Sequence, residues 1–190
     1  RSVFGNKLTC FIFRTGIGLK ISDTQTGLRG IPAGILPRFI ETKGDRFEYE
    51  TNQLLDILDD EGVKATFFLV GDWVDNFPDD VKEIYSRGHD IGNHSDTHPH
   101  MPQLSIGDET AEIQKCNDKI EAITGHAPTL FRAPYGDYNS KVVSVCRDAG
   151  YEVVQWSVDS LDWKNYGVQD MITKATRNVK SGDIVLFHND

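Results

Sequence analysis

The sequence lacks several features that would mark a membrane protein or a nucleic-acid binder. No apolar run reaches the roughly 18–20 residues that span a bilayer, so no transmembrane helix is predicted. Basic residues are outnumbered, with 20 Lys and Arg against 29 Asp and Glu, and a net charge of −9 argues against nucleic acid as a partner. The first residues show no apolar core followed by a cleavage site, so no signal peptide is predicted. The remaining composition, 38% hydrophobic and 26% charged, is typical of one globular domain.

Cysteine is also scarce. Cys10, Cys116 and Cys146 are an odd number, and they form no Cys-x-x-Cys pair. Cys116 and Cys146 each fall on the apolar stripe of a predicted helix. We therefore favour buried free thiols, which act as small hydrophobic side chains, over a disulfide or a thiolate site.

From residue 51 onward, helices and strands alternate along the sequence. Amphipathic periodicity and glycine stops predict helices at 51–60, 78–87, 108–124, 140–149 and 168–175. Short runs rich in β-branched and aromatic residues predict strands at 64–70, 89–93, 129–132, 152–157 and 183–187. This order predicts an α/β fold with a parallel sheet covered by helices.

Polar motifs follow the predicted strands, where functional residues of such folds lie. The first, Asn-His-Ser-Asp-Thr-His, places His94 and His98 four residues apart. On one helical turn such imidazoles could share a metal ion, although an isolated pair of this spacing more often consists of two solvated histidines. Because a strand ends just before His94 and the pair opens the following loop, we interpret the two residues as metal ligands.

The later motifs each allow a structural and a functional interpretation. Arg132 in Arg-Ala-Pro-Tyr-Gly is either a buried arginine at a tight turn or an arginine that holds a carboxylate by a bidentate pair. Asp162 either caps a turn or orients an imidazole, and Trp163 either covers the core or forms a wall for a sugar ring. His188 directly follows the last predicted strand and is either structural or a general acid tuned by a carboxylate.

Together, in this order, the four motifs resemble those of the polysaccharide deacetylases, carbohydrate esterase family 4. Gly-His-Asp-Ile-Gly-Asn-His-Ser-Asp-Thr-His-Pro resembles the family's metal motif, and Phe-Arg-Ala-Pro-Tyr-Gly, Ser-Leu-Asp-Trp and Asp-Ile-Val-Leu-Phe-His resemble the motifs that follow it. The flanking sequences are most similar to the sporulation-type members that act on peptidoglycan. The resemblance covers residues 51–190 and implies an incomplete (β/α) barrel of the deacetylase type, with parallel strands and outer helices. It implies metal ligands His94 and His98, catalytic residues His188, Asp162 and Arg132, and substrate-binding residues Tyr135, Trp163 and Pro134.

The first catalytic motif of that family does not match. Family members have a strand that ends in Phe-Asp-Asp-Gly or Phe-Asp-Ala, and its aspartates serve as the general base and the third metal ligand. Here residues 39–50 read Phe-Ile-Glu-Thr-Lys-Gly-Asp-Arg-Phe-Glu-Tyr-Glu. Asp45 is the nearest candidate for the third ligand, because Gly44 would let the backbone turn it inward.

Residues 1–52 resemble instead the later part of a family-2 glycosyltransferase, in Leu-Lys-Ile-Ser-Asp-Thr-Gln-Thr-Gly-Leu-Arg-Gly-Ile-Pro and Lys-Gly-Asp-Arg-Phe-Glu-Tyr-Glu-Thr-Asn. We therefore expect a chimera, in which a glycosyltransferase-like segment, 1–50, replaces the usual first strand before a deacetylase domain, 51–190. The chain begins without Met and stops soon after the last strand, so we also expect a fragment that is truncated at the C-terminus.

The resemblance implies a divalent-metal hydrolase, with zinc the most common metal, that removes N-acetyl groups from a peptidoglycan- or chitin-like polymer. It implies an extracytoplasmic or cell-surface location, an N-acetylated polysaccharide as the partner, and a monomer. Since the base and one ligand are missing, we expect little or no turnover. The alternatives are a non-catalytic carbohydrate-binding remnant and a glycosyltransferase fragment.

Overall fold

The structure is a computed structural model, and it describes residues 47–164 and 167–188. Contacts divide the chain into two compact units. The central unit comprises Lys64–Gln155, and the flanking unit combines residues up to Val63 with residues from Trp156 onward. Residues 1–46 of the predicted segment 1–50, with Cys10 and Asp45, lie outside the described residues.

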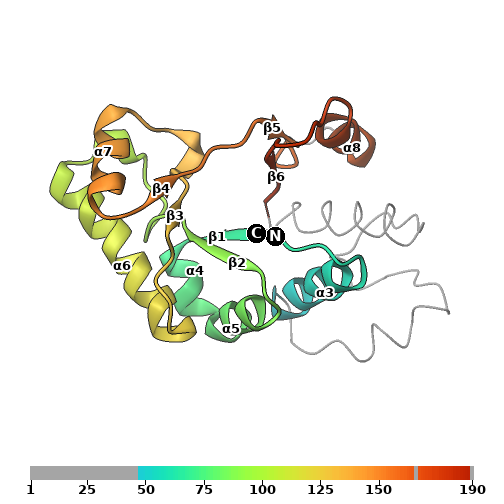
Figure 1. Cartoon of the computed structure of the whole chain (residues 1–190), viewed down its shortest axis with the longest axis horizontal. Coiled ribbons are helices and arrows are strands. Elements are labelled where there is room, and N and C mark those ends of the chain that lie inside the picture. The colour runs from blue at the N-terminus through green and yellow to red at the C-terminus, as the bar shows by residue number, and fades with distance from the viewer. Residues whose placement is uncertain (1–46, 165–166, 189–190) are drawn as a thin grey trace. The chain divides into compact units, whose positions relative to one another are not determined.

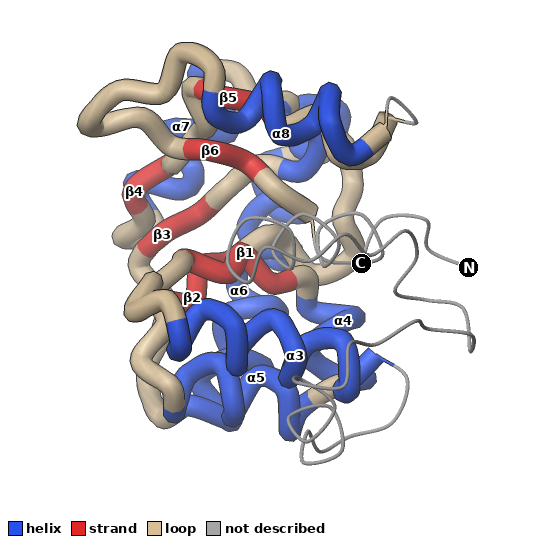
Figure 2. Tube along the Cα trace, turned by 90° about the vertical axis from the view of Figure 1, so that its right-hand side faces the viewer, coloured by secondary structure: helices blue, strands red, loops and turns tan. Residues whose placement is uncertain are grey.

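The central unit contains a parallel sheet with the strand order β1-β2-β3-β4 (Figures 1 and 2). Its strands are β1 (Thr66–Leu69), β2 (Asp90–Asn93), β3 (Leu130–Phe131) and β4 (Glu152–Val153). Phe68 of β1 pairs with Gly92 of β2, and a Cβ atom at Gly92 would lie 2.5 Å from the Phe68 ring. Only glycine therefore fits at this close approach of the two strands.

The central unit contains four α-helices, of which α6 and α7 have a side-chain cap at the N-terminus. They are α4 (Gly71–Asn76), α5 (Pro78–Ser86), α6 (Ile106–Thr124) and α7 (Ser140–Asp148), with single 3₁₀ turns η1 (Met101–Gln103) and η2 (Pro134–Gly136). Ser105 caps α6 by accepting a hydrogen bond from the Asp108 amide, and Gly125 ends that helix with φ 74°. Both α5 and α6 contact β2, and α7 contacts β4 (Figure 1).

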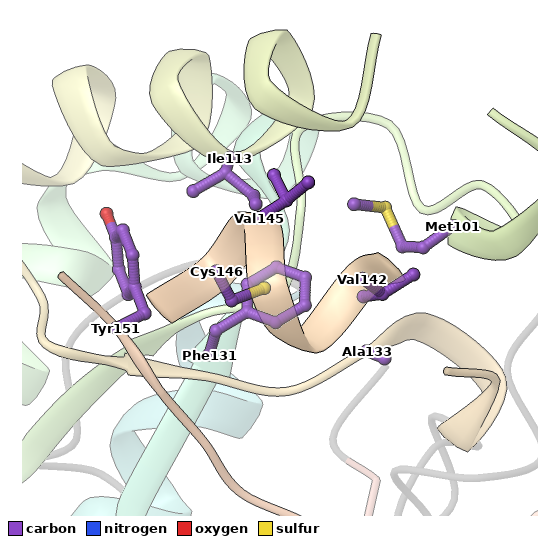
Figure 3. Close-up of a cluster of buried hydrophobic side chains, with 8 residues drawn as sticks. All are labelled: Met101, Ile113, Phe131, Ala133, Val142, Val145, Cys146 and Tyr151. Carbon is purple, nitrogen blue, oxygen red and sulfur yellow. The ribbon is translucent and has the colours of Figure 1, made fainter. Parts of the chain in front are cut away.

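A cluster of buried hydrophobic side chains fills the space between α6, α7 and the sheet (Figure 3). Phe131 of β3 is fully buried at its centre, and its ring meets that of Tyr151 edge to face, with centroids 6.5 Å apart. The Tyr151 hydroxyl donates a 2.6 Å hydrogen bond to Asn117, and burial raises the pKa of Tyr151 to about 12. A buried aromatic ring of this kind contributes about 1.5–3 kcal/mol by burial alone, so this cluster anchors the sheet to both helices. Its members are Met101, Ile113, Phe131, Ala133, Val142, Val145, Cys146 and Tyr151.

The flanking unit contains α3 (Phe47–Asp60), α8 (Val168–Thr176) and a second, two-stranded parallel sheet of β5 (Val158–Asp159) and β6 (Val185–Leu186). Val158 pairs with Val185, and Asp159 pairs with Leu186. Helix α8 contacts β5. This unit therefore holds the ends of β5 and β6, after which Asp162 and His188 follow.

The structure confirms the predicted α/β class with parallel strands, and it confirms Cys116 and Cys146 as buried free thiols. Local structure differs from the prediction at two places. Of the predicted strand 152–157, only Glu152–Val153 forms β4, and the next strand, β5, begins at Val158 and belongs to a different sheet. Helix α4 was not predicted. Helix α7 begins at Ser140, as predicted, and Asn139 is its capping residue. Within the described residues, no helix is long and apolar enough to cross a membrane.

Candidate functional site

His94 and His98 lie in the loop that follows β2, and their imidazole rings lie together. The ring centroids are 4.9 Å apart, with an angle of 66° between the ring planes. The loop is not a helical turn, because Ser95 (φ 68°) and His98 (φ 60°) both have left-handed backbone conformations. The alternative of two histidines on a helix is therefore wrong, and the predicted loop position is confirmed.

Hydrogen bonding fixes which nitrogen of His94 carries its proton. The Nδ1 atom lies 2.7 Å from the carbonyl oxygen of Arg132, and a carbonyl oxygen can only accept, so Nδ1 carries the hydrogen. The lone pair of the neutral ring is then on Nε2. This is the arrangement in which metal-binding histidines are usually found, with the second nitrogen bonded to a backbone carbonyl or a carboxylate.

The two imidazoles fit a divalent metal only in part. A catalytic zinc site usually has three protein ligands, and no group of three or more His, Cys, Asp or Glu side chains suited to a metal occurs in the described ranges 47–164 and 167–188. Asp96 lies between the two histidines in sequence, but its carboxylate is buried and lies 2.6 Å from the ammonium of Lys119. Any third ligand from residues 1–46, including Asp45, lies outside the part of the chain that the structure describes.

Arg132 lies at the end of β3, where its backbone and side chain contact different groups. Its guanidinium lies 4.0 Å over the Phe68 ring, and its Nε donates a 3.4 Å hydrogen bond to the carbonyl of Val154. Burial lowers the pKa of Arg132 to about 10, which still leaves the side chain charged at neutral pH. The predicted role, holding a carboxylate, remains a prediction.

Tyr135 presents an exposed ring beside the histidine pair. It lies in η2, which begins at the buried Pro134, and its φ of 60° places it in the left-handed region. Its ring meets that of His98 edge to face, with centroids 4.6 Å apart, and stacks on that of His100 at 4.1 Å. His100 Nδ1 lies 3.0 Å from the Asp137 carboxylate. Tyr135 is 60% exposed, so its ring is available to a ligand.

Asp162 and His188 form a close pair in the flanking unit. The Asp162 carboxylate accepts a 2.6 Å hydrogen bond from the His188 amide and lies 2.8 Å from His188 Nδ1. An ionised carboxylate can only accept, so Nδ1 carries the hydrogen and Nε2 is the atom that can exchange a proton with a substrate. The Asp162 carboxylate also accepts a 3.0 Å hydrogen bond from the Trp163 amide. Trp163 itself is 48% exposed, and the Lys164 ammonium lies 4.6 Å from the centroid of its ring.

The structure thus brings the predicted residues together in two groups, one in each unit. His94, His98 and Tyr135 are in contact in the central unit, and Arg132 is joined to them through its carbonyl. Asp162 and His188 are in contact in the flanking unit. The sequence did not indicate His100, although it directly follows His98-Pro99, nor Glu112 and Lys119, which reach the histidine loop from α6.

Comparison with known proteins relates this geometry to one family. The family model described as polysaccharide deacetylase matches residues 44–154. A peptidoglycan-N-acetylglucosamine deacetylase of Bacillus cereus is 34% identical over 139 residues, which are 73% of this chain and 50% of that protein. A chitooligosaccharide deacetylase of Bradyrhizobium is 33% identical over 140 residues, covering 73% of this chain and 64% of that protein.

Solved structures give the same relation. A carbohydrate esterase family 4 pseudoenzyme from Bacillus anthracis is 36% identical, with a TM-score of 0.71, over 73% of this chain and 50% of that one. A mutant of that pseudoenzyme, described as having restored enzymatic activity, superposes with a TM-score of 0.72 at 35% identity, over 78% of this chain and 54% of that one. The chain spans about half of the length of these proteins and 29% of one further curated relative, the peptidoglycan-N-acetylmuramic acid deacetylase PdaC of Bacillus subtilis.

Proposed function

The chain belongs to the polysaccharide deacetylase family, and we propose that it binds an N-acetylated cell-wall polysaccharide of the peptidoglycan or chitin type but releases little or no acetate. The binding part of this proposal is carried by the His94–His98 pair, with His94 Nδ1 bonded to a backbone carbonyl, beside the exposed ring of Tyr135. The low acetate release is carried by residues 39–50, which contain no Asp-Asp pair. The curated relatives named above are deacetylases of such polymers, and one structural relative is a pseudoenzyme.

His94 and His98 would hold the metal, and imidazole nitrogen is a ligand type that suits zinc, as it does copper, iron and nickel. We propose zinc because it is the most common metal of this family. When bound, such a metal supplies polarisation of the amide carbonyl and an acidified water. A site with two protein ligands should bind it more weakly than one with three, which is the first reason to expect low turnover.

His188 is the proposed general acid. Hydrolysis of an acetamide adds water to the acetyl carbon, breaks the carbon–nitrogen bond and requires a proton on the departing amine. The Asp162 carboxylate fixes the His188 ring and keeps the hydrogen on Nδ1, so that Nε2 is the atom that handles this proton. The buried carboxylate is held by hydrogen bonds from the backbone amides of His188 and Trp163, which keeps the pair in one orientation.

The general base is the missing component. In this family it is the first aspartate of the Phe-Asp-Asp-Gly motif, and residues 39–50 contain no such pair. Loss of a general base typically lowers the rate by about 10²–10⁴-fold. We propose that Arg132 would hold the carboxylate of that base in place. Arg132 is still charged at neutral pH, and we infer that its guanidinium has a different partner here from the one it would have in an active relative.

Sugar binding does not require the missing base. Tyr135 and Trp163 expose 60% and 48% of their surface, and aromatic rings of this kind can pack against the apolar face of a sugar ring. Pro134 sets the turn that presents Tyr135. These exposed rings, retained in a chain without the base, favour the second candidate function, a non-catalytic carbohydrate-binding protein. Its setting would be the cell wall, and it would act there as a monomer.

The test is to incubate the whole chain with an N-acetylglucosamine pentamer and Zn²⁺ or Co²⁺ while measuring acetate and, by ligand-observed NMR, binding. We expect binding that weakens when Tyr135 or Trp163 is replaced by alanine, with acetate release near background. Turnover in the ordinary enzyme range of about 1–10³ per second would show that another carboxylate has taken the role of the base. Binding of a nucleotide sugar, with no binding of the pentamer, would favour the glycosyltransferase fragment instead.

A further inference from the structure

The loop that carries the two histidines has an unusual backbone that must be held from outside. Ser95 and His98 have φ values of 68° and 60°, which residues other than glycine rarely adopt. Such conformations persist only where the surrounding structure determines them. The contacts of residues 95–97 therefore decide whether the two imidazoles stay together.

Glu112 on α6 makes three of these contacts with one carboxylate. Its Oε2 atom accepts hydrogen bonds from the backbone amides of Asp96, at 2.9 Å, and Thr97, at 2.8 Å. Its Oε1 atom accepts a 2.9 Å hydrogen bond from the Thr97 hydroxyl. Hydrogen bonds from backbone N–H groups to a carboxylate are charge-assisted and stronger than neutral ones. The two peptide groups midway between His94 and His98 are thus fixed to a helix.

The opposite side of the same loop is fixed by α4. The amides of Gly71 and Asp72 donate hydrogen bonds to the carbonyls of Ser95, at 3.0 Å, and Asp96, at 2.9 Å. Helix α6 therefore holds the amides of Asp96 and Thr97, and α4 holds the carbonyls of Ser95 and Asp96. The α4 contacts use backbone atoms, whereas the hydrogen bonds from the Asp96 and Thr97 amides to α6 depend on the side chain at position 112. Lys119 of α6 contacts the Asp96 side chain and not the backbone of the loop.

We propose that Glu112 is a positioning residue that holds His94 and His98 in their metal-binding geometry. The proposal deepens the proposed function and rests on it, since it assumes that these histidines bind the metal. The Glu112 carboxylate acts on the imidazoles through residues 96 and 97, with which it makes its three hydrogen bonds.

The experiment measures two quantities on the whole chain and on three variants. The first is the affinity for Zn²⁺ or Co²⁺ alone, and the second is the exchange rate of the Asp96 and Thr97 amide hydrogens in metal-free protein. We expect E112A to bind the metal about 10- to 100-fold more weakly, which is the usual loss for a group that supports a metal ligand, and to exchange both amides faster. E112Q should stay within a few-fold of the wild type, because its amide oxygen can accept both N–H bonds and the Thr97 hydroxyl can accept from its NH₂ group. E121A removes an exposed carboxylate from the same helix and should change neither quantity.

Several results would overturn the proposal. Wild-type metal affinity and wild-type amide exchange in E112A would do so, and so would equal losses in E112A and E121A. If E112A does not fold, E112D takes its place, since it keeps the charge but withdraws the carboxylate by one methylene; unchanged affinity and exchange in E112D would equally contradict the proposal. A variant with both His94 and His98 replaced by alanine tests the metal site separately from the role of Glu112. Unchanged metal affinity in that variant refutes the proposed metal site, whereas the amide exchange in E112A still decides whether Glu112 holds the loop.

Discussion

Replacing Asp162 with asparagine tests the pair that would protonate the leaving group. The carboxylate is buried and accepts from three donors: His188 Nδ1 and the Trp163 amide at one oxygen, and the His188 amide at the other. Asparagine has the same shape but only one acceptor oxygen. Whichever way the amide turns, its NH₂ group must face at least one of these N–H donors, all of which are partly buried.

The expected magnitude follows from that one mismatch. Loss of a hydrogen bond to a charged group costs about 1.5–3 kcal/mol, so the free energy of opening this part of the flanking unit should fall by that amount. The assay is hydrogen exchange at the His188 amide, which should become roughly 10- to 100-fold faster, with nitrogen NMR of the imidazole to read its tautomer. D159N is the matched control, because Asp159 accepts only a single described hydrogen bond, from the Leu161 amide at 2.8 Å, which asparagine can keep. Unchanged exchange and an unchanged tautomer in D162N would refute the view that the carboxylate orients His188.

Other regions of the chain allow further predictions. G71A should weaken Zn²⁺ or Co²⁺ binding about 10-fold or more, since a Cβ atom there would lie 2.1 Å from Asp96 Oδ1 and must displace the histidine loop; affinity equal to that of the wild type would contradict this. Burial raises the pKa of the Cys116 and Cys146 thiols to about 12. In a C10S background, neither thiol should therefore react with a thiol reagent at pH 8 until the protein is unfolded. Rapid labelling of the native protein would contradict this prediction. The same raised pKa values predict how the free energy of unfolding depends on pH. It should be unaffected by these thiols below about pH 9, the ordinary thiol pKa, and should fall as the pH rises towards 12, because only the unfolded chain then releases these protons. A denaturation series across that range with no such fall would contradict the burial of these thiols.

The sequence predicted those elements whose signals are local. Gly88 and Gly125 were expected to follow helix ends, and both have positive φ values. The early end of β4 at Val153 could not be predicted, because no proline or glycine interrupts Glu-Val-Val-Gln-Trp-Ser. The strand ends there because its pairing with β3 ends, and the next strand, β5, pairs with β6 in the other sheet. The short helix α4 was missed because six residues carry too little periodicity to be recognised.

In the candidate site too, features with a local sequence signal were predicted and those that depend on distant contacts were not. The sequence placed His94 and His98 in one loop by their spacing, and the structure brings their rings together. It placed Asp162 and His188 after two strands without pairing them, and the structure shows them in contact. The role of Glu112 could not be predicted, since it depends on contacts with residues 15 and 16 positions away along the chain that no local pattern records. Residues 39–50 stand where the family has its Asp-Asp motif, and most of them lie outside the described ranges.

Acetate release after restoration of the missing motif tests the central claim most directly. A variant in which the residues before Thr51 are replaced by a strand that ends in Phe-Asp-Asp-Gly should release acetate from an N-acetylglucosamine polymer in the presence of Zn²⁺ or Co²⁺. The same variant with His188→Ala should lose about 10²–10⁴-fold of that rate, the usual contribution of a general acid. If the restored chain folds and binds the metal but still releases no acetate, the deacetylase mechanism proposed for these residues is wrong.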